Sequence, residues 1–305
     1  MSLGSARGAV SAGRIGYAIL RSSGALALWR WLVPGRIILA YHNVIAAGEY
    51  PRAETALHLP ADRFERQLKW VANRFDVVAL GELLDGLNGA GHRERLAAIT
   101  FDDAYRGVFR NAAPLLERLR LPATVFVVTE AAESGAPFWW DLVAEGRPDL
   151  DRKALRNRWR GEGSRILSEL GDAVGAVRLP EEYLPADWET IAKHAGLLEV
   201  GAHTVTHPML TALPADALDD ELHQCRIMLR DRIGVDARAI AYPYGDWNLD
   251  VAEAARRAGY RMGLTSSGGR VLPSARELQL PRVGISASTS PAAFAAAASG
   301  LRWRR

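Results

Sequence analysis

The sequence is poor in cysteine, in long apolar runs and in stretches of a single charge, and each shortage excludes a class of protein. The single cysteine, Cys225, rules out a disulfide within the chain, and the apolar residues at helical spacing around it predict a core position. A formal net charge of +3 over 305 residues, without a long Lys/Arg stripe, argues against a nucleic acid as partner. The remaining composition, 49% hydrophobic and 24% charged, is typical of a globular enzyme with a sizeable core.

The first 36 residues mix apolar stretches with arginine. Arg14, Arg21, Arg30 and Arg36 interrupt these stretches before the ~20 apolar residues that a membrane span needs. The best apolar stretch is short and no small-residue cleavage site follows it, which argues against a cleaved signal. We therefore predict an amphipathic helix within residues 1–36, packed on the protein or, alternatively, lying on an anionic membrane through residues 12–34. The expected location is cytoplasmic or peripheral at the membrane, with the periplasm left open.

Short apolar runs, each ending in polar or turn residues, recur along the rest of the chain and alternate with segments of helical periodicity. This alternation predicts an α/β fold in which crossover helices join parallel strands, and seven candidate runs are a barrel-like number. The runs are residues 37–40, 77–80, 96–101, 123–128, 197–202, 237–241 and 260–265. Residues 139–190 break the rhythm, so we interpret them as a helical insertion within one domain spanning residues 37–305.

Residues suited to metal binding and proton transfer follow two of these runs. Asp102 and Asp103 come directly after residues 96–101, and His203, with His207 four positions on, follows residues 197–202. Alone, each motif has a plainer interpretation, a helix cap or a surface histidine pair. In parallel α/β barrels, however, the carboxyl ends of the strands converge on one face. There, one carboxylate and two imidazoles would give a metal three ligands and leave a position for water, while the second carboxylate takes a proton.

The other histidines receive a structural or solvent-facing interpretation. His58, His92 and His194 lie in polar loop or helix-end contexts, and His223 lies one residue off an apolar stripe. The sequence contains no Gly-x-Ser-x-Gly elbow of a serine hydrolase, and its glycine pairs lack the context of a phosphate-binding loop.

Two motifs resemble the signature of a known family, the polysaccharide deacetylases of carbohydrate esterase family four, also called the NodB homology family. Residues 100–103 (TFDD) resemble its first motif and residues 203–207 (HTVTH) its second. The resemblance extends from about residue 38 to residue 285. It implies a distorted (β/α) barrel and metal-dependent hydrolysis of the acetamide group of N-acetylated sugars.

The resemblance also assigns roles to individual residues. Asp102 would be the general base, and Asp103, His203 and His207 the ligands of a divalent metal. Zinc is the expected metal, with cobalt, nickel, iron and manganese as alternatives. Residues 242–245 (YPYG) resemble the third motif of the family, so the backbone N–H of Tyr244 would help to stabilise the oxyanion.

The chain departs from the family pattern at two points. Many members carry an arginine that orients the base where this chain has Ala241, so orientation must come from elsewhere. Many members also take their acid from a histidine near the C-terminus, but none follows His223. The exopolysaccharide deacetylases of the poly-N-acetylglucosamine type use an early Tyr-His motif instead. Residues 39–44 (LAYHNV) resemble that motif and make His42 the candidate acid; the alternative is a strand-end histidine that only hydrogen-bonds a ligand.

A further set of residues is assigned to the substrate, an N-acetylated oligo- or polysaccharide. Aromatic side chains that follow a predicted strand at residues 138–141 (FWWD) would stack on sugar rings, although tryptophans equally serve in cores. The predicted substrate-binding residues are Tyr105, Trp139, Trp140, Asp141, Tyr242 and Pro243. Two rival functions stay open: a deformylase or small-molecule amidohydrolase of the same superfamily, and a catalytically silent glycan-binding module. The presence of both the aspartate pair and the histidine pair argues against the silent module.

Overall fold

The core of the molecule is a curled sheet in which all strand pairs are parallel. The computed structural model describes residues 35–85 and 95–299 of the chain. The strand order is β10-β1-β5-β6-β7-β8-β9, with β4 paired to β5 off this path. The strands are β1 (Ile37–Tyr41), β4 (Asp76–Val77), β5 (Leu96–Phe101), β6 (Ala123–Val127), β7 (Leu198–Ala202), β8 (Ala239–Ala241), β9 (Met262–Leu264) and β10 (Val283–Gly284).

Residues 280–284 join the two edges of this sheet. Leu280 forms a parallel bridge with Leu264 at the end of β9, and β10 then pairs with β1. The sheet therefore closes into a distorted barrel, which confirms the predicted fold class. Closure also turns Arg282 inward between the two bridges, and this side chain is buried to 1% exposure.

Each of the seven predicted runs overlaps a strand of the sheet. One run lies mostly outside its strand, and three further strands were not predicted. The run at 77–80 contributes only the last residue of β4, because helix α4 (Leu80–Asp85) begins at Leu80. A separate parallel pair, β2 (Asn43–Ile45) and β3 (His58–Pro60), was not predicted, nor was β10. Strands of two or three residues have no periodicity that a sequence can display. The polar-loop interpretation of His58 was wrong, since it lies on β3 and is fully buried.

Amphipathic helices cover the outside of the barrel. In α3, Phe64, Leu68 and Val71 form the buried stripe that the sequence predicts. In α12, Cys225 is fully buried as expected, and the helix ends at Gly234, whose left-handed φ of 70° suits glycine. The helices outside the insertion are α3 (Ala61–Ala72), α4, α5 (Ala113–Leu119), α6 (Thr129–Ser134), α11 (Trp188–His194), α12 (Ala215–Ile233), α13 (Leu249–Arg257) and α14 (Pro291–Ala298), with a π-helical turn η2 (Val108–Ala112) before α5.

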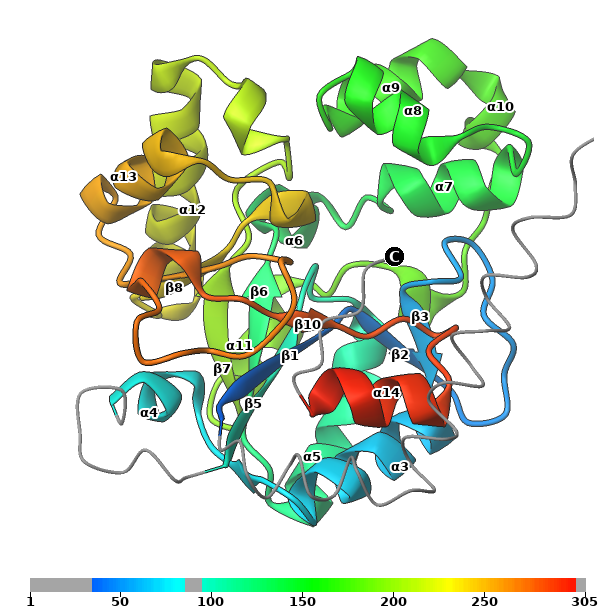
Figure 1. Ribbon diagram of the computed structural model, residues 1–305. Coiled ribbons are helices and arrows are strands. Elements are labelled where there is room, and N and C mark those ends of the chain that lie inside the picture. Colours follow the sequence, from blue (N-terminus) through cyan, green and yellow to red (C-terminus); the bar gives the residue numbers. More distant parts are fainter. Residues whose placement is uncertain (1–34, 86–94, 300–305) are drawn as a thin grey trace, which may run out of the picture.

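The segment predicted as a helical insertion folds into a group of short helices that Figure 1 shows together beyond one end of the sheet, away from α3, α5 and α14. They are α7 (Trp139–Gly146), α8 (Arg152–Arg158), α9 (Gly163–Leu170) and α10 (Asp172–Gly175). The turn η3 (Glu181–Tyr183) follows them in the sequence and lies against β2. Within residues 35–85 and 95–299, no helix has both the length and the apolar character needed to cross a bilayer. The predicted amphipathic helix, its membrane contact through residues 12–34, and His92 lie outside the described residues.

Candidate metal centre and active site

Three buried side chains converge where β5 and β7 end. Asp103 Oδ1 lies 3.4 Å from His203 Nε2 and 3.6 Å from His207 Nε2. Two ligands about 2.0–2.1 Å from a tetrahedral zinc ion are about 3.3 Å apart, so this spacing fits a shared ion. Asp103 Oδ1 is also buried without a well-formed hydrogen bond, as expected of an atom that faces a cation. These are the three residues that the sequence predicts as metal ligands, and the set can hold a divalent metal.

The backbone around the three ligands is held in conformations that side-chain-bearing residues seldom adopt. Asp103, Thr204 and His207 have φ values of 69°, 68° and 64°. Such left-handed conformations carry a cost and are concentrated at functional sites. Here Thr204 Oγ1 accepts a hydrogen bond from the backbone N–H of His207 at 3.1 Å. The turn therefore aims both imidazoles at Asp103.

Glu221 of α12 secures the same turn from outside. Its Oε2 accepts hydrogen bonds from the backbone N–H groups of Val205 at 2.8 Å and Thr206 at 3.0 Å. Its Oε1 accepts from the Thr206 hydroxyl at 2.6 Å. Sequence reasoning missed Glu221, because an exposed-looking glutamate on a helix gives no signal of the turn it binds.

The two histidines differ in their surroundings. His203 Nδ1 lies 2.8 Å from the carbonyl oxygen of Ala241, which fixes this nitrogen as the donor and leaves Nε2 to face Asp103. Burial lowers the pKa of His203, but the carboxylates of Asp102 and Asp103 outweigh it and raise that pKa above its usual value. Burial and the neighbouring His203 instead lower the pKa of His207 to about 3. His207 is thus neutral near pH 7, the form in which imidazole binds metals.

Arg282 contacts Asp102 in the way expected of the family arginine that this chain lacks at position 241. Its Nη1 and Nη2 donate to the two carboxylate oxygens of Asp102 at 2.6 Å and 2.8 Å, a bidentate pair with both partners buried. Burial by itself would raise the pKa of Asp102, but the Arg282 guanidinium outweighs it and holds the pKa well below its usual range. Asp102 is therefore ionised and fixed in orientation. The sequence places Arg282 about 180 residues away from Asp102, and only closure of the barrel brings them together.

His42 lies beside Asp102 at the end of β1. Its Nε2 is 4.0 Å from Asp102 Oδ2, and its side chain is 27% exposed while that of Asp102 is 7% exposed. His42 Nδ1 is buried and has no hydrogen-bond partner among the described residues. The predicted acid is thus next to the predicted base and reaches solvent, while its role stays a prediction.

Comparison with known proteins identifies the family. A family model described as polysaccharide deacetylase matches residues 89–263, more than half of the chain. The chain belongs to the polysaccharide deacetylase family. The match contains Asp102, Asp103 and both histidines, whereas His42 and Arg282 lie outside it.

Individual relatives of this deacetylase are distant in sequence and close in fold. The Bacillus subtilis protein YxkH, named for the same family, is 23% identical over 85% of this chain and 74% of its own length. The Staphylococcus aureus poly-beta-1,6-N-acetyl-D-glucosamine N-deacetylase is 24% identical over 73% of this chain and 66% of its own length, just under two thirds. Among solved structures, the Streptococcus pyogenes deacetylase PplD gives a TM-score of 0.63 at 21% identity, covering 86% of this chain and 97% of PplD. IcaB from Ammonifex degensii gives 0.61 at 22% identity, covering 87% and 97%.

The residues predicted to bind substrate lie under the deacetylase site, with little exposure. Tyr105, Asp141 and Tyr242 are fully buried, and Trp139 and Trp140 are 5% and 6% exposed. The Tyr242 hydroxyl donates to the carbonyl of Leu278, and Pro243 is buried in a short turn. Trp139 and Trp140 pack against each other, and Trp140 also packs against the metal ligand His207. Their contact with substrate stays a prediction.

Tyr244 lies at the boundary between the barrel and the insertion of the deacetylase. Its φ of 58° turns the chain sharply, and its ring centroid is 4.5 Å from that of His207. From the insertion, Trp139 Nε1 donates to the Tyr244 hydroxyl at 3.4 Å, and the Arg156 guanidinium lies 5.1 Å from the ring centroid. The oxyanion role of the Tyr244 backbone N–H stays a prediction.

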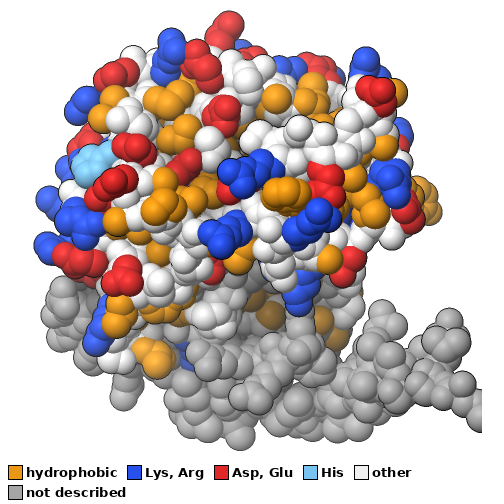
Figure 2. All heavy atoms as spheres, turned by 90° about the horizontal axis from the view of Figure 1, so that it is seen from above, with side chains coloured by type: hydrophobic (Ala, Val, Ile, Leu, Met, Phe, Trp, Pro, Cys, Tyr) orange, Lys and Arg blue, Asp and Glu red, His pale blue; other side chains and the backbone are white. Residues whose placement is uncertain are grey.

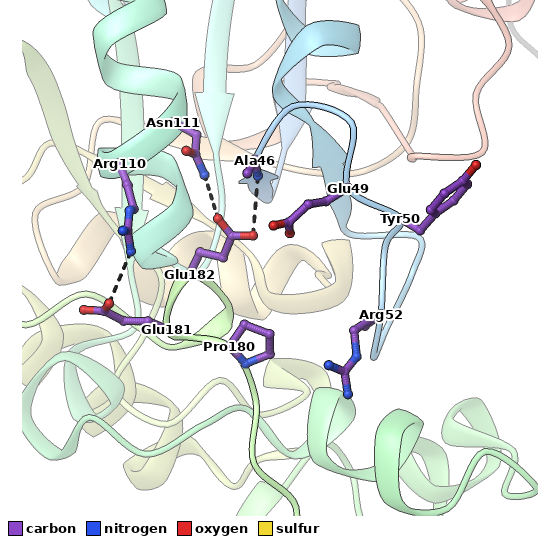
Figure 3. A pocket seen from close by; sticks show the side chains of 9 residues that line it. All are labelled: Ala46, Glu49, Tyr50, Arg52, Arg110, Asn111, Pro180, Glu181 and Glu182. Carbon is purple, nitrogen blue, oxygen red and sulfur yellow. Dashed lines mark hydrogen bonds and ion pairs between the residues drawn. The ribbon is translucent and has the colours of Figure 1, made fainter.

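A pocket of 540 Å³ lies beside β2 and is separate from the metal triad. Figure 3 shows that Glu182 in this pocket accepts from Asn111 and the Ala46 N–H, while Glu181 pairs with Arg110. None of the metal ligands, Asp102 or His42 lines it. It is therefore not the deacetylase centre.

On the face in Figure 2, basic and acidic side chains are interspersed without a stripe of one sign.

Proposed function

We propose that this chain removes acetyl groups from N-acetylated sugar residues of a polysaccharide, with zinc as the metal. The observation that carries the proposal is the Asp103, His203 and His207 triad beside an ionised Asp102 held by Arg282. A bound zinc ion would supply Lewis-acid activation of water and of the acetamide carbonyl. Membership of the polysaccharide deacetylase family supports the reaction type.

Within this reaction, Asp102 is the proton acceptor. Arg282 keeps the Asp102 carboxylate ionised and fixes its plane, and Oδ2 of that carboxylate lies 4.0 Å from His42 Nε2. The buried surroundings exclude bulk water, which strengthens each charge interaction in the site. Arg282 thereby takes the role of the arginine that many family members carry at the position of Ala241.

His42 is the proton donor to the departing amine. The C–N bond of the acetamide breaks readily only when its nitrogen is protonated, so that the sugar leaves as an amine. A group able to give a proton is therefore needed near that bond. His42 is the ionisable side chain beside Asp102 that reaches solvent. We assign the backbone N–H of Tyr244 to the developing oxyanion; the support is that the ring of Tyr244 lies 4.5 Å from that of His207 and that its φ of 58° turns the chain there.

For the substrate, we propose a β-1,6-linked N-acetylglucosamine polymer. Support comes from the Staphylococcus aureus relative, which is named for that polymer, and from the presence of an early Tyr-His pair in place of a C-terminal histidine. The chain is expected to act within the polymer rather than on the free monosaccharide, because binding remote sugars supplies energy for positioning the reacting one.

The test is acetate release by the purified protein after chelation and reloading with zinc. The substrate is a β-1,6-linked N-acetylglucosamine pentamer, with the β-1,4-linked pentamer and the N-formylated analogue as comparisons. We expect acetate from the β-1,6 pentamer only after zinc is restored, and none from His203→Ala. Formate release exceeding acetate release would refute the deacetylase assignment, and preference for the β-1,4 pentamer would refute the polymer assignment alone.

A further inference from the structure

The two metal-binding histidines are oriented by different means. His203 has the usual support, a hydrogen bond from Nδ1 to the Ala241 carbonyl. His207 Nδ1 is buried and has no hydrogen-bond partner among the described residues. Since metal-binding histidines almost always gain their orientation from such a bond, something else must hold the His207 ring.

Aromatic rings surround His207. The Trp140 centroid lies 4.9 Å from that of His207 with the planes inclined at 54°, and the Tyr244 centroid lies 4.5 Å away at 78°. Contacts of this distance and tilt are favourable and directional for aromatic rings. The imidazole therefore contacts an indole and a phenol on two adjacent sides, and the centroids of those two rings are 6.4 Å apart.

Trp140 is itself fixed in place by the fully buried Tyr105. The indole Nε1–H donates to the Tyr105 hydroxyl at 2.7 Å, and that hydroxyl donates in turn to Asp141 Oδ2 at 2.7 Å. The Phe138 ring stacks on Trp140 at 4.7 Å with an interplanar angle of 6°. The indole thus has one hydrogen bond and one stacking partner that together leave a single orientation.

The chain of hydrogen bonds continues away from the metal through Asp141. Asp141 Oδ1 accepts from the Glu54 backbone N–H at 3.0 Å and from His58 Nε2 at 2.8 Å. His58 Nδ1 then accepts from Asn43 Nδ2 at 3.0 Å, so the network assigns the Nε2–H tautomer to His58. Asn43, His58, Tyr105 and Asp141 are all fully buried, and the hydrogen bonds that link them are strengthened by the low dielectric of such a dry environment.

We propose that Tyr105 and Asp141 are positioning residues for the metal centre, which fix the Trp140 indole so that it orients the His207 imidazole. The helix that carries Trp140 and Asp141 is α7, the first of the insertion, so the insertion supplies part of the outer support of a metal ligand that follows β7 of the barrel. Contact of these side chains with the sugar stays a separate prediction. The inference rests on the metal site of the proposed function and is independent of the substrate.

The test is Tyr105→Phe, which keeps the ring and removes only the hydroxyl that links Trp140 to Asp141. The matched control is Tyr260→Phe, because Tyr260 is also buried and donates one hydrogen bond, to the Leu222 carbonyl, within the α12 packing. Zinc affinity of the metal-free proteins is measured by competition with a chromophoric chelator, and the cobalt-loaded proteins are compared by their visible absorption. For Tyr105→Phe we expect zinc affinity to fall about 10- to 100-fold and the cobalt bands to shift, with KM for the pentamer unchanged. Tyr260→Phe should retain wild-type affinity and spectrum.

Wild-type zinc affinity and cobalt bands in Tyr105→Phe would overturn the inference, and a raised KM with unaltered metal binding would assign Tyr105 to the substrate instead. If Tyr105→Phe does not fold, Trp140→Phe tests the same contact. Wild-type zinc affinity and cobalt bands in Trp140→Phe would likewise overturn the inference. Wild-type protein that binds zinc but releases no acetate would refute the proposed reaction while leaving this inference supported by the variant. Wild-type protein that binds no metal would refute both.

Discussion

Replacing Arg282 by methionine is the sharpest test of the site, because the change removes one charge and preserves most of the side-chain volume. Asp102 would remain buried with its carboxylate facing an apolar group in place of a bidentate partner at 2.6 Å and 2.8 Å. Breaking a buried pair by removing one partner costs about 3–5 kcal/mol, since the remaining charge is uncompensated. We expect the free energy of unfolding at pH 7 to fall by that amount.

The decrease in the free energy of unfolding caused by Arg282→Met depends on pH. Arg282 holds the pKa of Asp102 below its usual value, so the pair stabilises the fold above the unfolded-state pKa, about 4 for aspartate. That contribution disappears as pH falls through the folded-state pKa, and the two proteins should converge in strong acid. Turnover at pH 7 should fall roughly 100-fold in Arg282→Met, because the base loses its orientation. Arg282→Lys should give an intermediate loss, since an ammonium keeps the charge but not the two-pronged geometry.

The assay combines urea unfolding of the metal-free proteins with acetate release by the zinc-loaded proteins. Adding Asp102→Asn completes a double-mutant cycle. In the Asp102→Asn background, Arg282→Met should lower the free energy of unfolding far less, because no buried carboxylate is left without a partner. Arg257→Met is the matched control, because Arg257 pairs with Asp219 at 2.8 Å while both side chains are more than 40% exposed; it should change stability by about 1 kcal/mol or less. A cost in Arg282→Met no larger than that of the control, with turnover retained, would refute the assignment of Arg282.

Three further predictions concern the base, the acid and the thiol. Asp102→Asn should keep its zinc, measured by metal analysis, while acetate release falls by orders of magnitude; retained activity would remove Asp102 as the base. His42→Gln should lose about 10²- to 10⁴-fold on the amide substrate but much less on an activated aryl acetate, whose leaving group needs no proton; equal losses on both would remove His42 as the acid. Because burial raises the pKa of the Cys225 thiol to about 12, a thiol reagent at pH 8 should label it only after unfolding, and rapid labelling of the native protein would contradict its buried position.

The alternation of short apolar runs with helical segments was enough to predict a parallel α/β barrel. Both the burial of a strand and the amphipathicity of a helix show as patterns among residues close together in the sequence. The same local logic located Asp102, Asp103, His203 and His207, since each follows the end of its own strand and parallel strands end on one face. Elements whose identity depends on a distant partner were missed. The strand β10 has two residues and is defined only by its pairing with β1.

Which side chains support the metal ligands and the base was decided by the tertiary structure. Arg282 meets Asp102 only because residues 280–284 close the barrel, and no spacing in the sequence encodes that closure. Tyr105, Trp140 and Asp141 were predicted to contact the sugar, and only the fold shows that Asp141 bonds to Tyr105 and His58 and that the Trp140 ring lies against His207. The sequence by itself determined which residues stand at the ends of strands, because that is a local property of the chain. Their partners were determined by the fold, because hydrogen bonds and ion pairs between distant segments exist only after the barrel and its insertion have packed together.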